Sequence, residues 1–194
     1  MAIVLEFNLI CKEFLDLEQI LHNSEIKKLK ISIEKISSID NWMWANQQEL
    51  QSMHLVSHAL NESKIIVINL KSDSLKDLGI YLEKINEEYV YNLWINTEGY
   101  PDLDADKINT GNEYYFQKFY QTFGEVVKEQ NMAFRILGIG VETNFQYKKN
   151  NSDIIRKSEN IITWIGNEDL ENDVALDNYK KKKVVGMDFL VFEK

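Results

Sequence analysis

The sequence predicts an α+β protein, in which a mixed or antiparallel sheet is combined with a few helices. Two observations lead to this prediction. Several segments alternate apolar and polar residues, as half-buried strands do, and others repeat apolar residues every three or four positions, as amphipathic helices do. Both patterns occur throughout the 194 residues. We therefore expect a single domain over residues 1–194, with a possible sub-boundary near residues 97–112.

The N-terminal segments switch between these two periods. "AIVLEFNL" alternates and predicts a strand, whereas "CKEFLDLEQILHN", residues 11–23, carries a helical stripe through Leu17 and Leu21. "KLKISIEKIS", residues 28–37, alternates again. "KIIVINL", residues 64–70, is a near-continuous apolar run of the kind that predicts a central strand.

The next two segments complete the first half of the chain. "SDSLKDLGIYLEKIN", residues 72–86, begins with a Ser74-x-x-Asp77 pair that is typical of a capping box, and its leucines follow at helical spacing. "EYVYNLWINTE", residues 88–98, predicts a strand. The order strand, helix, strand, insert, strand, helix, strand resembles the ferredoxin-like βαβ-βαβ arrangement, in element order only. Such folds have many functions, so this order implies no activity.

The insert and the second half complete the assignment. Within "DNWMWANQQELQSMHLVSHALNES" we expect a helix over residues 41–52, while residues 53–60 fit a helix or a strand equally. "EYYFQKFYQTFGEVVKEQ", residues 113–130, predicts a long amphipathic helix. Three largely antiparallel C-terminal strands should follow: "AFRILGIGVETNFQY", "NIITWIG" and "VVGMDFLVF". Gly138 and Gly140 should mark a bend or bulge, or close packing against an aromatic residue.

Composition and charge limit the class of partner. The chain has 22 basic and 31 acidic residues, a formal net charge of −9. A polyanion would be repelled, so we expect no nucleic acid, and a basic protein or a cation fits better. Cys11 is the single cysteine, as in proteins of a reducing cytosol, and no apolar stretch is long enough to span a membrane. We expect a cytoplasmic protein without a membrane partner, and the richness in Ile, Lys and Asn suggests a bacterial genome.

The segment "DLDADKINTGNE", residues 102–113, comes closest to a known motif. Carboxylates occupy the first, third, fifth and twelfth positions, as in a calcium-binding EF-hand loop: Asp102, Asp104, Asp106 and Glu113. However, Lys107 replaces the glycine of the sixth position, and a strand precedes the loop instead of a helix. Thr110-x-x-Glu113 also reads as a capping box for the following helix. We expect a contact surface first and a cation site second, and we expect no cofactor.

Other candidates for chemistry have simpler explanations. His54 and His58 lie four residues apart without the glutamate of an H-E-x-x-H motif, so we expect structural or surface histidines. There is no nucleophile elbow and no Walker-type loop, and Cys11 reads as a small buried residue. The lysine run at residues 180–183 should be a solvated edge beside the last strand. These observations favour a protein without catalytic activity.

The functional hypothesis is a cytoplasmic protein that binds another protein through an acidic, aromatic-bearing face built around residues 96–106. The residues expected to bind the partner lie in two segments: Trp42 and Trp44, and Glu98, Tyr100, Asp102, Asp104 and Asp106. One version is an immunity- or antitoxin-type protein that masks a basic toxin, with acidic charge steering the encounter.

Two alternatives belong to different classes. The first is a small-molecule or divalent-cation module, or an enzyme, with its site near residues 102–106 in the cleft between the first sheet and the helix at 113–130. The second is a structural subunit of a homo-oligomer, such as a homodimer, in which an edge strand like "VVGMDFLVF" pairs across a two-fold axis.

Overall fold

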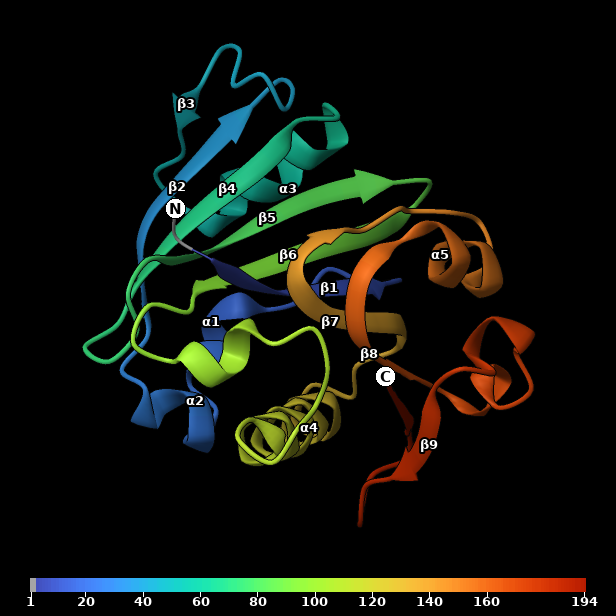
Figure 1. Cartoon of the computed structure of the whole chain (residues 1–194). Helices are drawn as coiled ribbons and strands as arrows, with labels where there is room; N and C mark the ends of the chain where they lie inside the picture. Colours follow the sequence, from blue (N-terminus) through green and yellow to red (C-terminus); the bar gives the residue numbers. More distant parts are fainter. Residues whose placement is uncertain (1–2) are drawn as a thin grey trace.

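The computed structural model describes residues 3–194 and contains one continuous sheet of ten antiparallel strands (Figure 1). The strand order is β3-β2-β4-β5-β6-β1-β7-β8-β10-β9. The strands are β1 (Val4–Cys11), β2 (Ser32–Ile39), β3 (Gln48–Glu49), β4 (Ile65–Lys71), β5 (Leu78–Ile85), β6 (Glu88–Asn96), β7 (Phe134–Asn144), β8 (Glu159–Gly166), β9 (Lys180–Lys183) and β10 (Leu190–Glu193). The sheet runs without interruption through both halves of the chain, because β1 lies between β6 and β7.

Five α-helices and three 3-10 turns accompany the sheet, so the fold is α+β. They are α1 (Leu17–Leu21), α2 (Ser24–Lys28), α3 (Met53–Asn61), α4 (Glu113–Glu129), α5 (Asn151–Lys157), η1 (Pro101–Asp104), η2 (Glu168–Leu170) and η3 (Val174–Leu176). Within residues 3–194, no helix combines the length and the apolar character needed to cross a bilayer.

The main core lies between one face of the sheet and helices α1, α3 and α4. Alternate residues of β1 point into it, beginning with the fully buried Leu5. Phe7 packs edge-on against Phe119 of α4, with ring centroids 5.1 Å apart. On α4, the apolar stripe expected from the sequence is confirmed, and Phe116 and Tyr120 are its most buried members.

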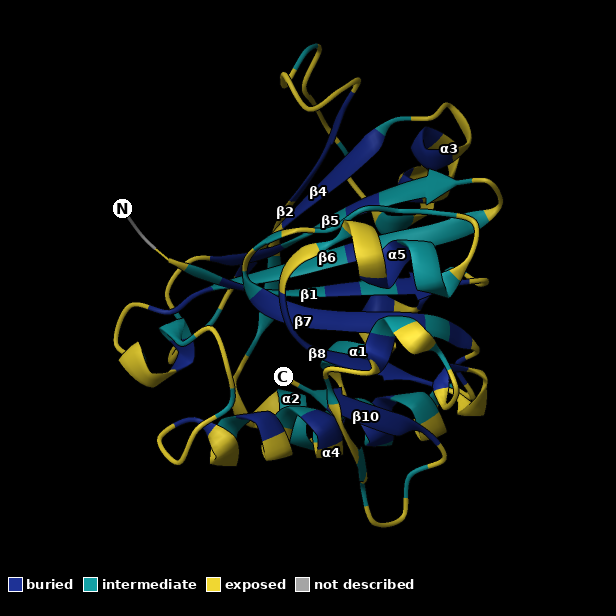
Figure 2. Cartoon of the chain, turned by 45° about the vertical axis from the view of Figure 1, so that its right-hand side comes forward, coloured by how far each residue is buried: buried dark blue, intermediate teal, exposed yellow. Residues whose placement is uncertain are grey.

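The opposite face of the sheet is covered over only part of its width. A second core, which includes Ile10, Ile136 and Trp164, lies beneath α5 and the turns η2 and η3. Figure 2 shows the consequence: β7 and β8 are largely buried, whereas β5 and β6 remain half-exposed. Within residues 3–194, no helix shields this part of the sheet, which is where the candidate site lies.

The expected helix over residues 72–86 is wrong, because this segment contains strand β5. The spacing of Leu75, Leu78 and Leu82 fits a helix, but Leu78, Ile80 and Leu82 also alternate as a strand requires. Pairing with β4 and β6 decides between the two, since a strand here completes the hydrogen bonds of both neighbours. The ferredoxin-like order is therefore not confirmed.

Two further segments differ from expectation. Residues 41–52 do not form a helix; they form a loop and the short strand β3, and the helix begins at Met53. Only the end of "VVGMDFLVF" is a strand, β10, and it pairs with β8 and β9 on its two sides. It is therefore not an edge strand. The edge strand at this end of the sheet is β9, whose four consecutive lysines oppose pairing with another strand of the same charge.

Gly138 and Gly140 have the roles expected of them. A Cβ atom on Gly138 would lie 2.7 Å from the ring of the buried Trp164, so the indole packs directly on the bare backbone. Gly140 lies at a register shift between β7 and β8, and a Cβ atom there would meet the Asn160 carbonyl oxygen. The first glycine permits close packing and the second permits a bulge.

Gly138→Ala should lower the free energy of unfolding by about 1–3 kcal/mol, because the added methyl group displaces Trp164 from a filled core. Urea denaturation of the wild type and the variant measures this change. In a Trp164→Phe background, where the smaller ring leaves room, the same substitution should cost clearly less. An unchanged stability in the Trp164 background would contradict this account of the packing.

Candidate functional site

An ordered loop between β2 and β3 holds three consecutive large apolar residues at the surface. Their exposed fractions are 53% for Trp42, 90% for Met43 and 46% for Trp44. The loop is closed by hydrogen bonds, including Asp40 N to Ala45 O at 3.0 Å and Asn46 Nδ2 to Asp40 Oδ2 at 2.7 Å. The loop therefore presents these side chains in a fixed arrangement.

Trp44 has a backbone conformation that bulky residues rarely adopt. Its φ is 58°, in the left-handed region, where a non-glycine residue is strained. Strain of this kind persists where the surrounding structure fixes it, and such positions concentrate at functional sites. The strain at Trp44 makes this loop a candidate for binding.

The two exposed tryptophans contact an aromatic pair on the open face of the sheet. The ring of Tyr81, on β5, lies 5.2 Å from Trp42 and 6.5 Å from Trp44 between centroids, in edge-on arrangements. Trp94, on β6, lies 6.3 Å from Tyr81 and packs over Gly79, where a Cβ atom would be 2.8 Å from the indole. Four aromatic rings thus form one cluster.

Two carboxylates lie beside this aromatic cluster. Glu83 follows Tyr81 on the same face of β5, and burial raises its pKa, although the nearby Trp42 indole lowers it in part. Glu6, on β1, pairs in register with Trp94. Its charge adds to the effect of burial in raising the pKa of the Tyr81 hydroxyl. The cluster therefore lies in a region of negative charge.

A closed ring of hydrogen bonds holds Glu6 in place. Asn92 Nδ2 donates to Glu6 Oε1 at 3.0 Å and to Asn8 Oδ1 at 2.7 Å. Asn8 Nδ2 donates to Thr143 Oγ1 at 3.0 Å, and the Thr143 hydroxyl donates to Glu6 Oε2 at 2.9 Å. The ring joins β6, β1 and β7, so it also fixes the orientation of the Asn92 amide.

Two buried polar atoms next to this ring have no partner within residues 3–194. They are Asn92 Oδ1, an acceptor, and Trp94 Nε1, a donor. Asn92 pairs directly with Tyr81 across the β5–β6 ladder, so the residue lies beside the aromatic cluster. Buried polar groups are normally hydrogen-bonded, and an unpaired one invites a ligand or water.

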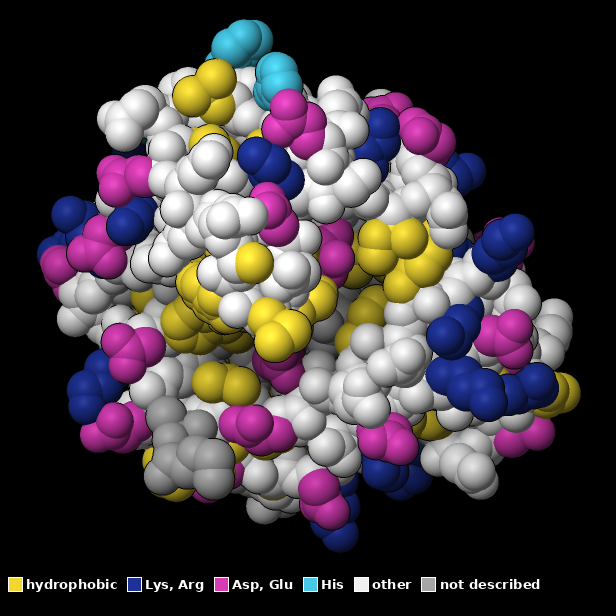
Figure 3. Space-filling view, turned by 90° about the horizontal axis from the view of Figure 1, so that it is seen from above, with side chains coloured by type: hydrophobic (Ala, Val, Ile, Leu, Met, Phe, Trp, Pro, Cys, Tyr) yellow, Lys and Arg dark blue, Asp and Glu magenta, His cyan; other side chains and the backbone are white. Residues whose placement is uncertain are grey.

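We refer to these six residues as the aromatic–acidic face: Trp42, Trp44, Tyr81, Trp94, Glu6 and Glu83. Figure 3 views the molecule from above Figure 1, the side on which the β2–β3 loop lies, and shows hydrophobic side chains gathered around a hollow with acidic side chains beside them. On this side of β5, β6 and β1, the residues in register include no lysine or arginine.

The acidic segment from Glu98 to Asp106 lies elsewhere. The Tyr100 ring packs against Tyr115 of α4, and the Tyr100 hydroxyl donates to Ser74 O at 3.3 Å. Glu98 forms an exposed ion pair with Lys76 at 2.8 Å. Figure 1 shows this segment, in light green, beside α4 and away from the β2–β3 loop. The structure therefore does not bring the two predicted groups of partner-binding residues together.

Asn112 organises the acidic segment. It is fully buried, and its Nδ2 donates to Asp102 O and Lys107 O, both at 3.1 Å, while Asn109 N donates to Asn112 Oδ1 at 2.8 Å. Helix α4 begins at Glu113 after Asn112, so the predicted capping box from Thr110 is wrong. Glu113 instead accepts a hydrogen bond from Gln117 within the helix.

The predicted cation ligands do not converge. Among the described residues, 3–194, no group of three or more His, Cys, Asp or Glu side chains lies close enough to hold a metal ion. Asp102 and Asp106 are exposed, and Asp104 is half-buried with one carboxylate oxygen that has no hydrogen-bond partner. His54 and His58 are exposed side chains of α3, and His58 faces Glu62 at 3.5 Å.

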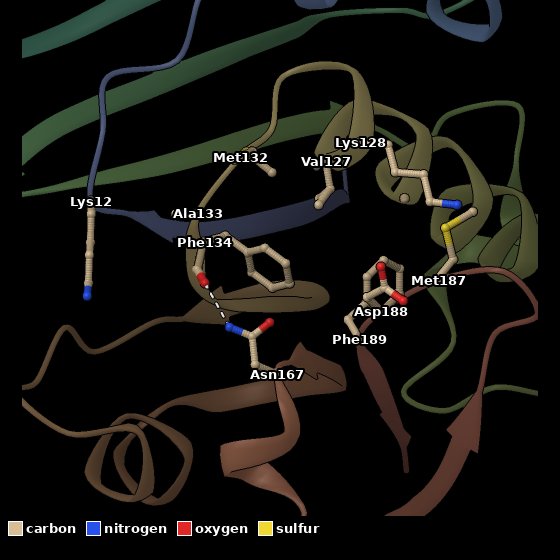
Figure 4. Close-up of a pocket in the computed structure, with 11 residues that line it drawn as sticks. Lys12, Val127, Lys128, Met132, Ala133, Phe134, Asn167, Met187, Asp188 and Phe189 are labelled. Atoms are coloured by element: carbon tan, nitrogen blue, oxygen red, sulfur yellow. Dashed lines mark hydrogen bonds between the residues drawn. The ribbon is translucent and has the colours of Figure 1, made fainter.

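A pocket of about 280 Å³ lies beneath the C-terminal half of α4 (Figure 4). Its lining is mostly apolar, with Met132, Phe134 and Phe189, and its amide Asn167 donates to Phe134 O. None of the predicted site residues lines it. The Asp102–Asp106 segment precedes the other end of α4, a 17-residue helix, and is thus distant from the pocket.

Cys11 is fully buried at the end of β1, as the sequence indicates. Burial raises the pKa of its thiol to about 12, with the Glu88 carboxylate adding a smaller contribution. A thiol with this pKa stays protonated at neutral pH, so it is a poor nucleophile.

Four residues of the aromatic–acidic face were not expected from the sequence: Tyr81, Trp94, Glu6 and Glu83. Their places follow from strand register, which aligns Tyr81 with Asn92 and Trp94 with Glu6. The signal that was available is the alternation of Tyr81 and Glu83 along β5, which places both on one face once residues 78–85 are recognised as a strand.

Comparison of this chain with models of protein families, with curated proteins and with solved structures finds no match.

Trp44→Asn should leave the protein more stable than the matched Trp42→Asn variant, by about 1 kcal/mol, because asparagine tolerates the left-handed conformation of position 44. Urea denaturation of both variants gives the difference. If Trp44→Asn proves the more destabilising of the two, the Trp44 ring stabilises the loop by packing, and the strain carries no functional meaning.

Proposed function

We propose that this chain is a non-catalytic protein that binds a positively charged protein partner through the aromatic–acidic face. The observation that carries the proposal is the run Trp42–Met43–Trp44, exposed on an ordered loop beside the carboxylates Glu83 and Glu6. Tryptophan and methionine are enriched at the centres of protein interfaces, and contiguous exposed apolar surface is unusual where no partner binds.

Order in the β2–β3 loop supports this role energetically. Binding with flexible loops loses conformational entropy, and each immobilised side chain costs about 0.5–1.5 kcal/mol. Hydrogen bonds within residues 40–46 already order this loop in the free protein, so binding loses less conformational entropy. Interfaces with few preordered aromatic anchors typically concentrate their binding energy on them.

The charge of the chain supports a basic partner. The net charge is −9, and acidic surfaces speed the encounter with a basic protein at low ionic strength. In this proposal the exposed acids Asp102 and Asp106, with Glu98, contribute to steering, while Trp42 and Trp44 make the central contacts. The concrete version is an immunity- or antitoxin-type protein that acts in the cytoplasm and masks a basic toxin.

The test uses the product of the gene adjacent to this one in its own genome. We expect that product to arrest growth when expressed alone, and co-expression of this chain to restore growth. The purified pair should form a complex by size-exclusion chromatography with light scattering, and the complex should weaken as salt increases.

The double variant Trp42→Ala/Trp44→Ala should lose at least tenfold in affinity, a typical effect of removing interface tryptophans. The matched control is Tyr114→Ala, which removes an exposed aromatic residue from α4, with 64% of its surface exposed, and should bind as the wild type does. Equal binding by the wild type and the double variant would exclude this face as the interface.

A further inference from the structure

We infer that the aromatic–acidic face receives an arginine side chain of its protein partner, with the guanidinium group lying among the rings of Trp42, Tyr81 and Trp94. The inference rests on the proposed function and names the chemical group that the face binds.

The aromatic rings favour a cation. Tyr81 has three aromatic neighbours with centroids within 6.5 Å, and the two tryptophans of the loop keep about half of their surface exposed. An exposed indole or phenol face attracts a cation through its quadrupole, and tryptophan does so most strongly. Arginine is the most frequent protein cation in such contacts, because its planar group stacks on the ring.

The two carboxylates and the unpaired amide oxygen of this face favour a ligand group that donates several hydrogen bonds. Glu83 lies beside Trp42, Glu6 lies in register with Trp94, and Asn92 Oδ1 is a buried acceptor without a partner within residues 3–194. A guanidinium carries five N–H donors and no acceptor, so it can satisfy acceptors on several sides at once. A lysine ammonium is more strongly hydrated and lacks the planar shape.

The charge balance of this face agrees with a cationic occupant. The side chains that share it on β5, β6 and β1 include Glu83, Glu88 and Glu6 but no basic residue. Lys35 of β2 and Arg135 of β7 also reach this face, and both are already paired: Lys35 with Glu49 at 3.5 Å, and Arg135 with Glu88 at 2.6 Å. Glu83 has no salt-bridge partner within residues 3–194, and its burial raises its pKa. An incoming cation would therefore compensate a carboxylate that the free protein leaves uncompensated.

The test titrates the isotope-labelled protein with the peptide acetyl-Gly-Gly-Arg-Gly-Gly-amide and follows the indole N–H signals of its four tryptophans by NMR. The signals of Trp42, Trp44 and Trp94 should shift saturably, with a dissociation constant in the millimolar range. Trp164, which is fully buried in the second core, is the internal control and should not shift.

Two further peptides separate charge from shape. A citrulline peptide, which is neutral and nearly isosteric, should cause no saturable shift, and a lysine peptide should bind at least threefold more weakly. If the citrulline peptide causes equal shifts, the face does not select a positive charge. If the lysine peptide binds as tightly as the arginine peptide, the face does not prefer arginine. Absence of any saturable shift at about 10 mM arginine peptide would overturn the inference altogether.

Glu83→Gln should weaken the arginine peptide about fivefold or more without disturbing the fold, since it removes one charge from a half-exposed side chain. Glu125→Gln, which removes one charge from a half-buried acid of α4 on the other side of the sheet, is the matched control and should change nothing. If both variants bind as the wild type does, the cation is not held by this face. Failure here leaves the proposed function to its own test, because a partner could still bind Trp42 and Trp44 without inserting an arginine.

Discussion

Strand β1 hydrogen-bonds along Leu5–Cys11 to β6 on one side and β7 on the other, and the rest of the structure depends on this double pairing. It joins the strands of the first half to those of the second in a single sheet. Because successive side chains point to opposite faces, one face of β1 packs beneath α4 while Glu6 and Asn8 point to the other. The same strand thus builds the core and fixes the polar ring of the candidate site.

One face of the sheet is covered over β7 and β8 and open over β5 and β6, and this division leaves the aromatic rings of the site accessible. Helix α5 and the turns after β8 shield the second core around Trp164, but they do not extend over β5 and β6. Over β5 the β2–β3 loop takes the place of a helix, and its two tryptophans contact Tyr81. Aromatic rings with one face against protein and the other exposed are suited to binding, and the carboxylates beside them select a positive group.

Much of the fold could be predicted from the spacing of apolar residues along the sequence, and the errors have physical causes. The helical stripe of α4 and the strands predicted within residues 64–70, 88–98 and 133–147 are confirmed. Residues 78–85 satisfy both periods, and the β5–β6 turn at Asn86 and Glu87 has positive φ at both residues without the glycine that usually marks such turns. Trp42 and Trp44 were predicted as partner-binding residues, with one of the two expected to be exposed. Tyr81 and Glu6, in contrast, come together only through strand register, which the pattern of a single strand does not specify.

The most direct measurement of the central claim is the pKa of Glu83, followed by NMR through its carboxyl carbon in the free protein and with saturating arginine peptide. In the free protein, burial raises this pKa above its ordinary value of 4.5, although the Trp42 indole opposes part of the change. A guanidinium beside the carboxylate stabilises the charged form, so the pKa should fall on binding, and affinity should decrease as the pH is lowered through the free-protein pKa. An unchanged Glu83 pKa at saturation would contradict the claim that this face receives a cation.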